Sequence, residues 1–291
     1  MIRCLLVVLA IGTAGAINRR RVIRTIGRAY ADRFLVDASG IVAGAHGFKL
    51  AGVNDRGLLL LHGSGDSPQS LRYLAERLNA AGYTVHAPLL PGHGRSPKAF
   101  ANATHSDYAT ETRRALDELR TSHQWIGLVG LSMGGALAAT AALEAPDVRL
   151  LVLLAPYMIP PMTVRWTNAT SWFWSWAAPY LRGRGEESVH DAAARNASRA
   201  YGSFSAGALA ALVATADVGL ESLPALTIPI LVINSTRDNR IPRSLADAAL
   251  NAIRAPVERH WVTGCGHVIT VDYCKTTVAD MVLAFLARHA G

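Results

Sequence analysis

The 291-residue chain contains only three cysteines, and no two of them form a C-x-x-C pair. Its ten histidines include no H-x-x-x-H spacing, so the sequence predicts no metal site. It also has no phosphate-binding loop, no RNA-binding aromatic pattern and no internal repeat. These absences argue against a metal centre and against nucleic acid as a partner, and we expect no cofactor.

The composition is that of a chain with one large core. Hydrophobic residues make up 51% of the sequence, and 291 residues suffice for a single α/β domain. Short apolar runs typical of buried strands alternate with helical stretches. The expected strands are Leu58–Leu61, Val85–Ala87, Trp125–Val129, Leu150–Leu154, Ile230–Asn234 and Val257–Val262. The alternation predicts a mostly parallel sheet with helices on both faces.

A G-x-S-x-G motif spans residues 130–134, between the expected strand at 125–129 and an alanine-rich helical stretch at 135–143. In this position Ser132 would lie on a sharp strand-to-helix turn with its hydroxyl exposed. Gly130 and Gly134 would be needed because a side chain at either position would collide with a neighbouring strand or helix. The context predicts that Ser132 is a nucleophile.

Two further residues could activate this serine. Asp238 follows the expected strand at 230–234, and His267 lies in a glycine-rich turn after the strand at 257–262. Each has an ordinary alternative, a turn former or helix cap for Asp238 and a loop histidine for His267. The order serine, aspartate, histidine is nevertheless that of α/β-hydrolases. We therefore predict His267 as the general base and Asp238 as the residue that orients it.

A serine nucleophile also needs donors for the oxyanion of the tetrahedral intermediate. The four-leucine strand at 58–61 ends in His62, Gly63 and Ser64. We predict the backbone N–H of Met133 as one donor and that of Ser64 as the other. His62 is expected to be structural.

The segments around these residues, with two other motifs, resemble the carboxylesterase and monoacylglycerol-lipase group of α/β-hydrolases. They are L-H-G-S-G at 61–65, G-Y-T-V-H-A-P at 82–88, P-G-H-G-R-S at 91–96, G-L-S-M-G-G at 130–135, R-D-N-R-I-P at 237–242 and G-H-V-I-T-V-D at 266–272. The resemblance implies an α/β-hydrolase core at 46–156 and 224–291. It further implies a serine esterase that forms an acyl-enzyme from a small-molecule or lipid ester. Cys265 departs from the pattern, where a serine or another small residue is usual.

Other functions remain open on the same fold. One alternative is a monoacylglycerol lipase or an acyltransferase with the same three residues. Another is a catalytically idle protein that binds lipid or a partner. A peptidase is less favoured, because the Gly-Gly-Pro-Gly stretch typical of proline aminopeptidases does not follow His62.

Residues 157–223 interrupt the alternation where such a fold carries its lid, or cap. Four of the six tryptophans in the chain lie in this segment, at Trp166, Trp172, Trp174 and Trp176. They would line an acyl pocket, dip into a lipid surface or pack the cap onto the core. An apolar, aromatic cap favours a hydrophobic acyl chain as substrate.

Residues 1–30 combine an apolar stretch with a cluster of arginines, which supplies much of the formal net charge of +8. The cluster comprises Arg19, Arg20, Arg21, Arg24 and Arg28. A signal peptide, a short membrane anchor and an interfacial helix all fit. We favour association with the cytoplasmic face of a membrane, with export after signal cleavage as the alternative.

Cys265 and Cys274 flank His267 and are candidates for a disulfide that spacing alone cannot establish.

Overall fold

The computed structural model describes residues 2–183 and 185–289, without the side chains of residues 2–11, 185 and 186. Its centre is a seven-stranded sheet in the order β1-β3-β2-β4-β5-β8-β9. The strands are β1 (Phe48–Leu50), β2 (Arg56–Leu61), β3 (Thr84–Ala87), β4 (Trp125–Leu131), β5 (Val148–Leu154), β8 (Ile230–Ser235) and β9 (Val257–Val262). All neighbours are parallel except β1, which pairs antiparallel with β3. The predicted sheet is confirmed, and β1 is an edge strand that the sequence did not predict.

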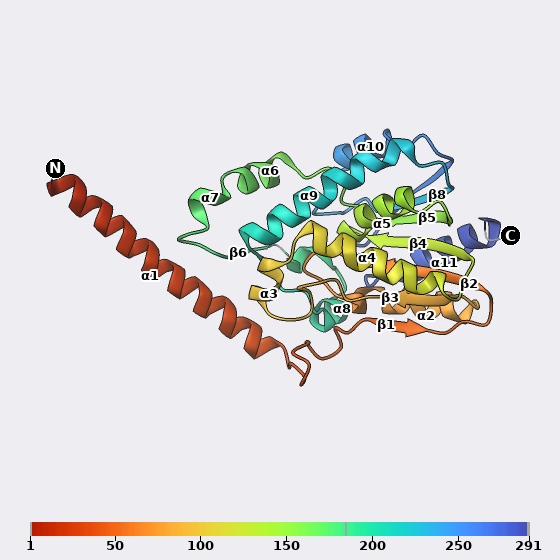
Figure 1. Cartoon of the computed structure of the whole chain (residues 1–291), viewed down its shortest axis with the longest axis horizontal. Coiled ribbons are helices and arrows are strands. Elements are labelled where there is room, and N and C mark those ends of the chain that lie inside the picture. Colours follow the sequence, from red (N-terminus) through yellow and green to blue (C-terminus); the bar gives the residue numbers. More distant parts are fainter. Residues whose placement is uncertain (1, 184, 290–291) are drawn as a thin grey trace.

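Helices cover both faces of this sheet (Figure 1). One face is covered by α2 (Arg72–Ala80) and α11 (Lys275–His289). The other is covered by α4 (His105–Arg120), α5 (Met133–Glu144), α9 (Ala206–Ser222) and α10 (Arg243–Leu250). The short helices η1 (Pro68–Leu71) and α3 (Pro97–Asn102) follow β2 and β3. The α/β class predicted from the sequence is therefore confirmed.

Strand β2 shows why its sequence is a continuous apolar run. Leu58 and Leu60 pack into the core on the α2 and α11 face, whereas Leu59 and Leu61 pack into the core on the α4 and α5 face. All four side chains are fully buried. A central strand covered on both faces has no solvent-facing side, so alternation with polar residues is lost. Each buried leucine contributes about 1.5–3 kcal/mol from transfer out of water.

The segment predicted to form the cap lies between β5 and β8, and we call it the cap. Its elements are α6 (Met162–Ala169), α7 (Ser171–Trp174), the antiparallel pair β6 (Leu181–Arg182) and β7 (Ser203–Phe204), η2 (Gly185–Ser188), α8 (Ala192–Ala197), α9 and η3 (Leu223–Ala225). Helix α9 runs from the cap onto the core, where it packs on α5. A Cβ at Gly219 would lie 2.5 Å from the Ala136 Cβ, so a larger residue there would push the two helices apart.

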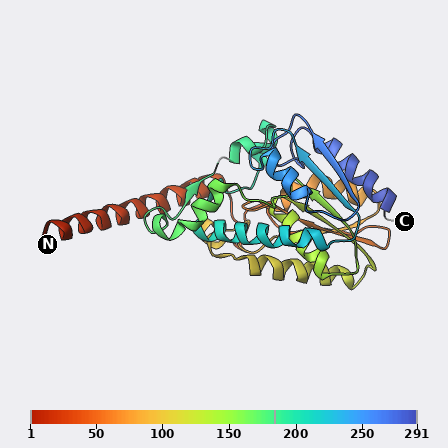
Figure 2. The same cartoon turned by 90° about the horizontal axis from the view of Figure 1, so that it is seen from above.

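Helix α1 (Ile2–Arg33) projects from the body of the molecule and meets it at the cap (Figures 1 and 2). The Trp176 ring contacts Gly15, and the Asn18 side chain donates to the Ala177 carbonyl over 3.0 Å. Near its other end, the Tyr30 ring stacks on Tyr201 with centroids 6.1 Å apart. The predicted N-terminal segment is therefore helical where described. Residue 1, and the side chains of its apolar part up to residue 11, lie outside the described residues.

One stretch of the described chain, Ala206–Ala225, is long and apolar enough to cross a membrane. Half of its most apolar window is buried within the structure. It consists of α9 and η3, which contribute Ala211 and Leu223 to the core, so packing inside the protein accounts for its composition.

Candidate active site

Ser132 occupies the turn between β4 and α5 in a strained backbone conformation, with φ 55° and ψ −120°. Non-glycine residues rarely adopt a positive φ, and such strain is found where a site requires it. A Cβ at Gly130 would lie 2.2 Å from the Gly134 carbonyl oxygen, and one at Gly134 would lie 2.1 Å from that of Leu61. The close approach of strand and helix therefore requires both glycines, as the sequence predicted.

The structure brings Ser132, His267 and Asp238 into one hydrogen-bonded chain. The His267 Nε2 lies 2.8 Å from the Ser132 Oγ, and its Nδ1 lies 2.7 Å from the Asp238 Oδ2. Asp238 follows β8 and His267 follows β9, so both stand beyond the carboxyl ends of neighbouring parallel strands. With its Nδ1–H donating to Asp238, the imidazole presents the Nε2 lone pair to the serine proton.

The Asp238 carboxylate is held on both oxygens. Its Oδ1 accepts the backbone N–H groups of Arg240 and Ile241, over 2.7 and 2.9 Å, while its Oδ2 faces His267. Burial alone would raise the pKa of Asp238, but the charge and hydrogen bond of His267 and the two backbone donors outweigh it, and the pKa is lowered. Asp238 is therefore a fixed anion beside the imidazole.

Ser64 and Met133, whose backbone amides are the predicted oxyanion donors, both lie next to Ser132. Ser64 lines the cavity beside Ser132, and Met133 is the first residue of α5. Neither amide donates a hydrogen bond to another residue in the described part of the chain. His62 is fully buried, its Nδ1–H faces the Gly63 carbonyl, and its Nε2 accepts the Leu90 N–H. His62 thus holds the loop that carries Ser64, a structural role as expected.

The loop that carries His267 is fixed by two features without a predicted role at the site. Cys265 and Cys274 form a disulfide that brackets the histidine. Asp272 is fully buried and accepts four backbone N–H groups. Two come from this loop, at Gly266 and Tyr273, and two from the cap, at His190 and Asp191. Asp272 therefore ties the histidine loop to the cap; its place in the motif at 266–272 was the only signal in the sequence.

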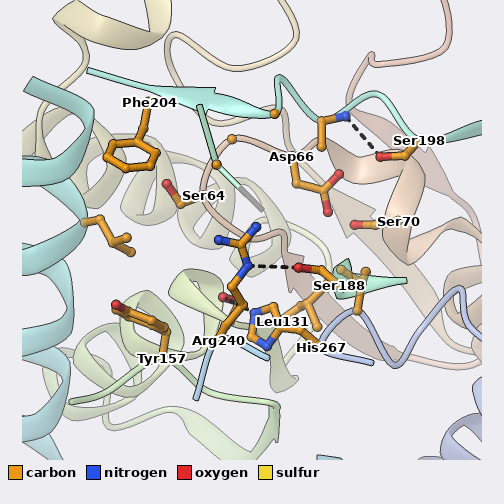
Figure 3. Close-up of a pocket in the computed structure, with 18 of the residues that line it drawn as sticks. Ser64, Asp66, Ser70, Leu131, Tyr157, Ser188, Ser198, Phe204, Arg240 and His267 are labelled. Carbon is orange, nitrogen blue, oxygen red and sulfur yellow. Dashed lines mark hydrogen bonds between the residues drawn. The ribbon is translucent and has the colours of Figure 1, made fainter. Parts of the chain in front are cut away.

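A cavity of about 360 Å³ opens over Ser132 and His267, with an apolar and a polar side. The apolar side comprises Phe100, Tyr157, Val164, Phe204, Leu209 and Leu212. The polar side includes Asp66, Ser70, Ser188 and Arg240. Figure 3 shows Tyr157 and Phe204 across the cavity from Asp66 and Ser70. Burial raises the pKa of Asp66 to about 6, although hydrogen bonds from Ser70 and the Ser67 backbone oppose the shift.

The four cap tryptophans do not line this cavity, so the expectation that they contact substrate there is not met. Trp166, Trp172 and Trp176 are exposed on the surface, with 64%, 78% and 43% of their area accessible. Trp174 is partly buried and donates its Nε1–H to the Thr167 carbonyl over 3.0 Å. Trp166 on α6 and Trp172 on α7 face outward, a direction that composition alone could not specify.

No group of three or more His, Cys, Asp or Glu side chains in residues 2–183 and 185–289 has the arrangement of a metal site.

Comparison with known proteins places this arrangement in a family. The family model described as serine aminopeptidase, S33 matches residues 53–273. The chain belongs to this α/β-hydrolase family. The hydrolase is 30% identical over 238 residues to the thermostable monoacylglycerol lipase of Bacillus sp. (strain H-257), covering 81% of the hydrolase and 92% of the lipase. It is 24% identical to the carboxylesterase of Bacillus subtilis (strain 168), covering 80% and 93% of the two chains.

Solved structures agree with this assignment. A metagenome-derived enzyme from a study of the lipolytic enzymes LipS and LipT is 30% identical, with a TM-score of 0.77 over 84% of the hydrolase and 98% of that chain. The monoacylglycerol lipase of Paleococcus ferrophilus has the same fold, with a TM-score of 0.72 at 19% identity over 84% and 98% of the two chains. The resemblance to the carboxylesterase and monoacylglycerol-lipase group is confirmed, and the protein is an enzyme of the carboxylic ester hydrolase type.

Proposed function

We propose that the hydrolase cleaves carboxylic esters with apolar acyl chains through an acyl-enzyme formed on Ser132. The observation that carries this proposal is the hydrogen-bonded chain from Ser132 through His267 to Asp238, at the floor of a half-apolar cavity. A serine hydroxyl is a weak nucleophile until a positioned base takes its proton, and this chain supplies that base and its orienting carboxylate.

In the proposed mechanism, the Ser132 Oγ attacks the ester carbonyl as its proton passes to the His267 Nε2. The negative charge of the tetrahedral intermediate falls on the oxygen that faces the amides of Ser64 and Met133. His267 then gives the proton to the leaving alcohol, and the C–O bond breaks to leave an acyl-serine. Water, deprotonated by His267, attacks this ester and releases the acid, which restores Ser132. Asp238 steadies the imidazolium in both half-reactions.

The apolar side of the cavity supports an aliphatic acyl group. Phe204, Leu209 and Leu212 line this side together with Tyr157 and Val164. An alkyl chain seated there would leave water at a gain of about 0.8 kcal/mol for each buried methylene group. The cavity volume of about 360 Å³ sets an upper limit on the acyl length that fits without movement of the cap.

A monoacylglycerol lipase is the second candidate, and the 30% identity to such an enzyme over 92% of its length favours it. An acyltransferase would use the same acyl-serine and hand the acyl group to an alcohol in place of water. The family description names an aminopeptidase, whereas the named relatives above are a lipase and a carboxylesterase. We therefore rank ester hydrolysis first.

Hydrolysis of 4-nitrophenyl esters from acetate to palmitate tests the proposal, with 1-monoacylglycerols and an added alcohol acceptor as further arms. Ser132→Ala should lower kcat/KM by at least about three orders of magnitude, because the acyl-enzyme can no longer form. Ser122→Ala, at an exposed position in the turn after α4, is the matched control and should retain full activity. Retention of more than about a hundredth of the rate by Ser132→Ala would overturn the assignment of the nucleophile.

We also propose that the hydrolase binds a membrane surface through α1 and the cap. Exposed aromatic and basic side chains lie together there: Arg19 on α1 donates to the Ser175 and Trp176 carbonyls, beside the exposed rings of Trp172 and Phe173. Tryptophan suits the boundary between water and acyl chains, and arginine suits anionic headgroups. Sedimentation with anionic vesicles measures this binding.

The side of the membrane on which the hydrolase lies needs a separate proposal, because two features of the chain point to different sides. The arginines that follow the apolar part of α1 support the cytoplasmic face. The Cys265–Cys274 disulfide supports the exported alternative, since disulfides persist in oxidising compartments. We propose export on the strength of the disulfide, with the part of α1 that carries Asn18 and Arg19 retained after cleavage, because the membrane contact proposed above depends on it. A reporter fused after residue 291 that is active only outside the cytoplasm would read the compartment, and an inactive reporter with intact fusion protein would contradict export.

A further inference from the structure

Arg240 points into the active-site cavity although the proposed mechanism does not use it. It lies two residues after Asp238 in the loop that follows β8, and Figure 3 shows its guanidinium in the middle of the cavity, between Ser64 and His267. Its Nε–H donates to the Ser188 Oγ over 2.8 Å, and the Ser188 hydroxyl donates in turn to the Asn239 Oδ1 over 3.1 Å. The cap therefore fixes one edge of the guanidinium and leaves the two Nη groups facing the cavity.

No carboxylate among the described residues pairs with this guanidinium. Arg165 and Arg120, by contrast, each form ion pairs on the protein surface, with Asp217 and with Asp147. Among the described side chains, Tyr157, Asp238 and Glu187 act on Arg240 through their charges, and none of them forms an ion pair with it. The Asp238 oxygens are already taken by His267 and by backbone amides.

An unpaired charge in such a place is costly. Burial lowers the pKa of Arg240, which shows that its surroundings disfavour the charged form. Arginine nevertheless stays protonated in proteins, so the cost is borne by the folded state. An anion that enters the cavity would remove this cost and would form charge-assisted hydrogen bonds with both Nη groups.

We propose that Arg240 is a specificity-determining residue that binds a free carboxylate carried by the ester substrate. The planar pair of Nη groups fits the two oxygens of a carboxylate end-on. A single guanidinium balances one negative charge, and the neighbouring Asp66, Asp238 and Glu187 would disfavour a doubly charged group. The preferred substrates are then esters that combine an apolar segment with a carboxylate, such as half-esters of dicarboxylic acids. This inference rests on the ester hydrolysis proposed above.

Matched pairs of esters test the inference on both sides of the scissile bond. On the acyl side, mono(4-nitrophenyl) glutarate is compared with 4-nitrophenyl pentanoate. On the alcohol side, O-butyrylglycolate is compared with ethyl butyrate. In each pair a carboxylate replaces a methyl group, so the ratio of the two kcat/KM values isolates the charge. We expect the ratio to exceed about ten in at least one pair for the wild-type enzyme, because each tenfold step equals about 1.4 kcal/mol, within the range of a charge-assisted hydrogen bond.

Arg240→Gln should lower that ratio of kcat/KM values at least about tenfold. Arg240→Lys keeps the positive charge but lacks the planar pair of Nη groups, so it should give an intermediate ratio. Arg237→Gln is the matched control, because it removes the same charge from an exposed position three residues earlier in the same loop. The control should keep the wild-type ratio. Equal ratios in Arg240→Gln and Arg237→Gln, or a wild-type preference for the neutral ester in both pairs, would overturn the inference.

A binding measurement separates this inference from the proposed function. Calorimetry with glutaric acid monoamide and with pentanamide, on the wild-type enzyme and on Arg240→Gln, requires no ester turnover. In this pair too a carboxylate replaces a methyl group. We expect the monoamide carboxylate to bind the wild type more tightly than pentanamide does, and this preference to be lost in Arg240→Gln. If no ester is hydrolysed but the preference for the carboxylate persists, the hydrolytic mechanism fails and the carboxylate site stands. If the neutral esters are hydrolysed but the carboxylate is not preferred, the hydrolytic mechanism stands and the carboxylate site fails.

Discussion

The catalytic floor comprises Ser132, His267, Asp238 and the polar residues that line the cavity beside them. Its surface is of the opposite kind to that of the cap with α1. On the floor, the His267 and Asp238 side chains are 8% and 3% exposed, and their polar atoms are paired at 2.7–2.9 Å. On the cap, Trp172 and Phe173 are 78% and 66% exposed. The floor completes its interactions within the protein, whereas the cap leaves large apolar groups in water.

This difference shows which contacts stabilise each region. The floor is pre-organised by burial, by the strained turn at Ser132 and by the four hydrogen bonds to Asp272, so it needs no rearrangement to act. Exposed aromatic rings gain nothing from folding and gain only on contact with another surface. We infer that the floor determines the chemistry and that the cap determines where it takes place.

The largest effect we expect is on kcat, and it comes from a substitution at Asp238 in the floor. Asp238→Asn keeps the shape of the side chain but removes the charge and lets the amide donate, which favours the wrong histidine tautomer. We expect kcat to fall about 10³–10⁴-fold on a short soluble ester. Asp247→Asn, on the exposed face of α10, is the control and should keep the wild-type rate. A fall of less than about tenfold in Asp238→Asn would show that the carboxylate does not orient His267.

A smaller effect is expected from removal of the exposed rings of the cap. The double variant Trp172→Ser and Phe173→Ser should lower the partition onto anionic vesicles about tenfold or more, since burying one such side chain contributes about 1.5–3 kcal/mol. Tyr273→Ser is the matched control, because Tyr273 is 66% exposed but lies in the histidine loop. Equal partition of the double variant and the control would remove the cap from the membrane proposal. Turnover of 4-nitrophenyl acetate checks that the variants are folded.

The strand pattern and the strand-to-helix turn at Ser132 could be predicted from the sequence because both follow from local rules. A continuous apolar run indicates a central strand, and Gly130 and Gly134 indicate a close backbone approach. The contacts of Asp272 with residues 190 and 191, and the direction of the Arg240 side chain, could not be predicted, because they depend on how the cap folds back over the core. The outward direction of Trp172 depends on the same packing.

The smallest effect we expect is on stability, and it comes from Asp66. Asp66 belongs to the floor, but its charge is not compensated as that of Asp238 is by His267 and two backbone amides. Burial raises its pKa from 3.8 to about 6, so the folded protein holds a proton on Asp66 that the unfolded chain releases at lower pH. Stability from this group is therefore intact below pH 4, declines as the pH rises to about 6 and stays reduced above it. The cost at neutral pH is about 3 kcal/mol at most.

Asp66→Asn should remove this cost while keeping an acceptor for Ser70 and for the Ser67 N–H. We expect the variant to exceed the wild type in free energy of unfolding by about 1–3 kcal/mol at pH 8 and to match it at pH 4, as measured by urea titration at both values. Asp280→Asn, at an exposed position on α11, serves as the control. A gain of equal size at both pH values would show that the effect comes from packing. A gain confined to pH 8 would mean that the cavity keeps a carboxylate at the expense of stability, as expected of a group retained for substrate binding.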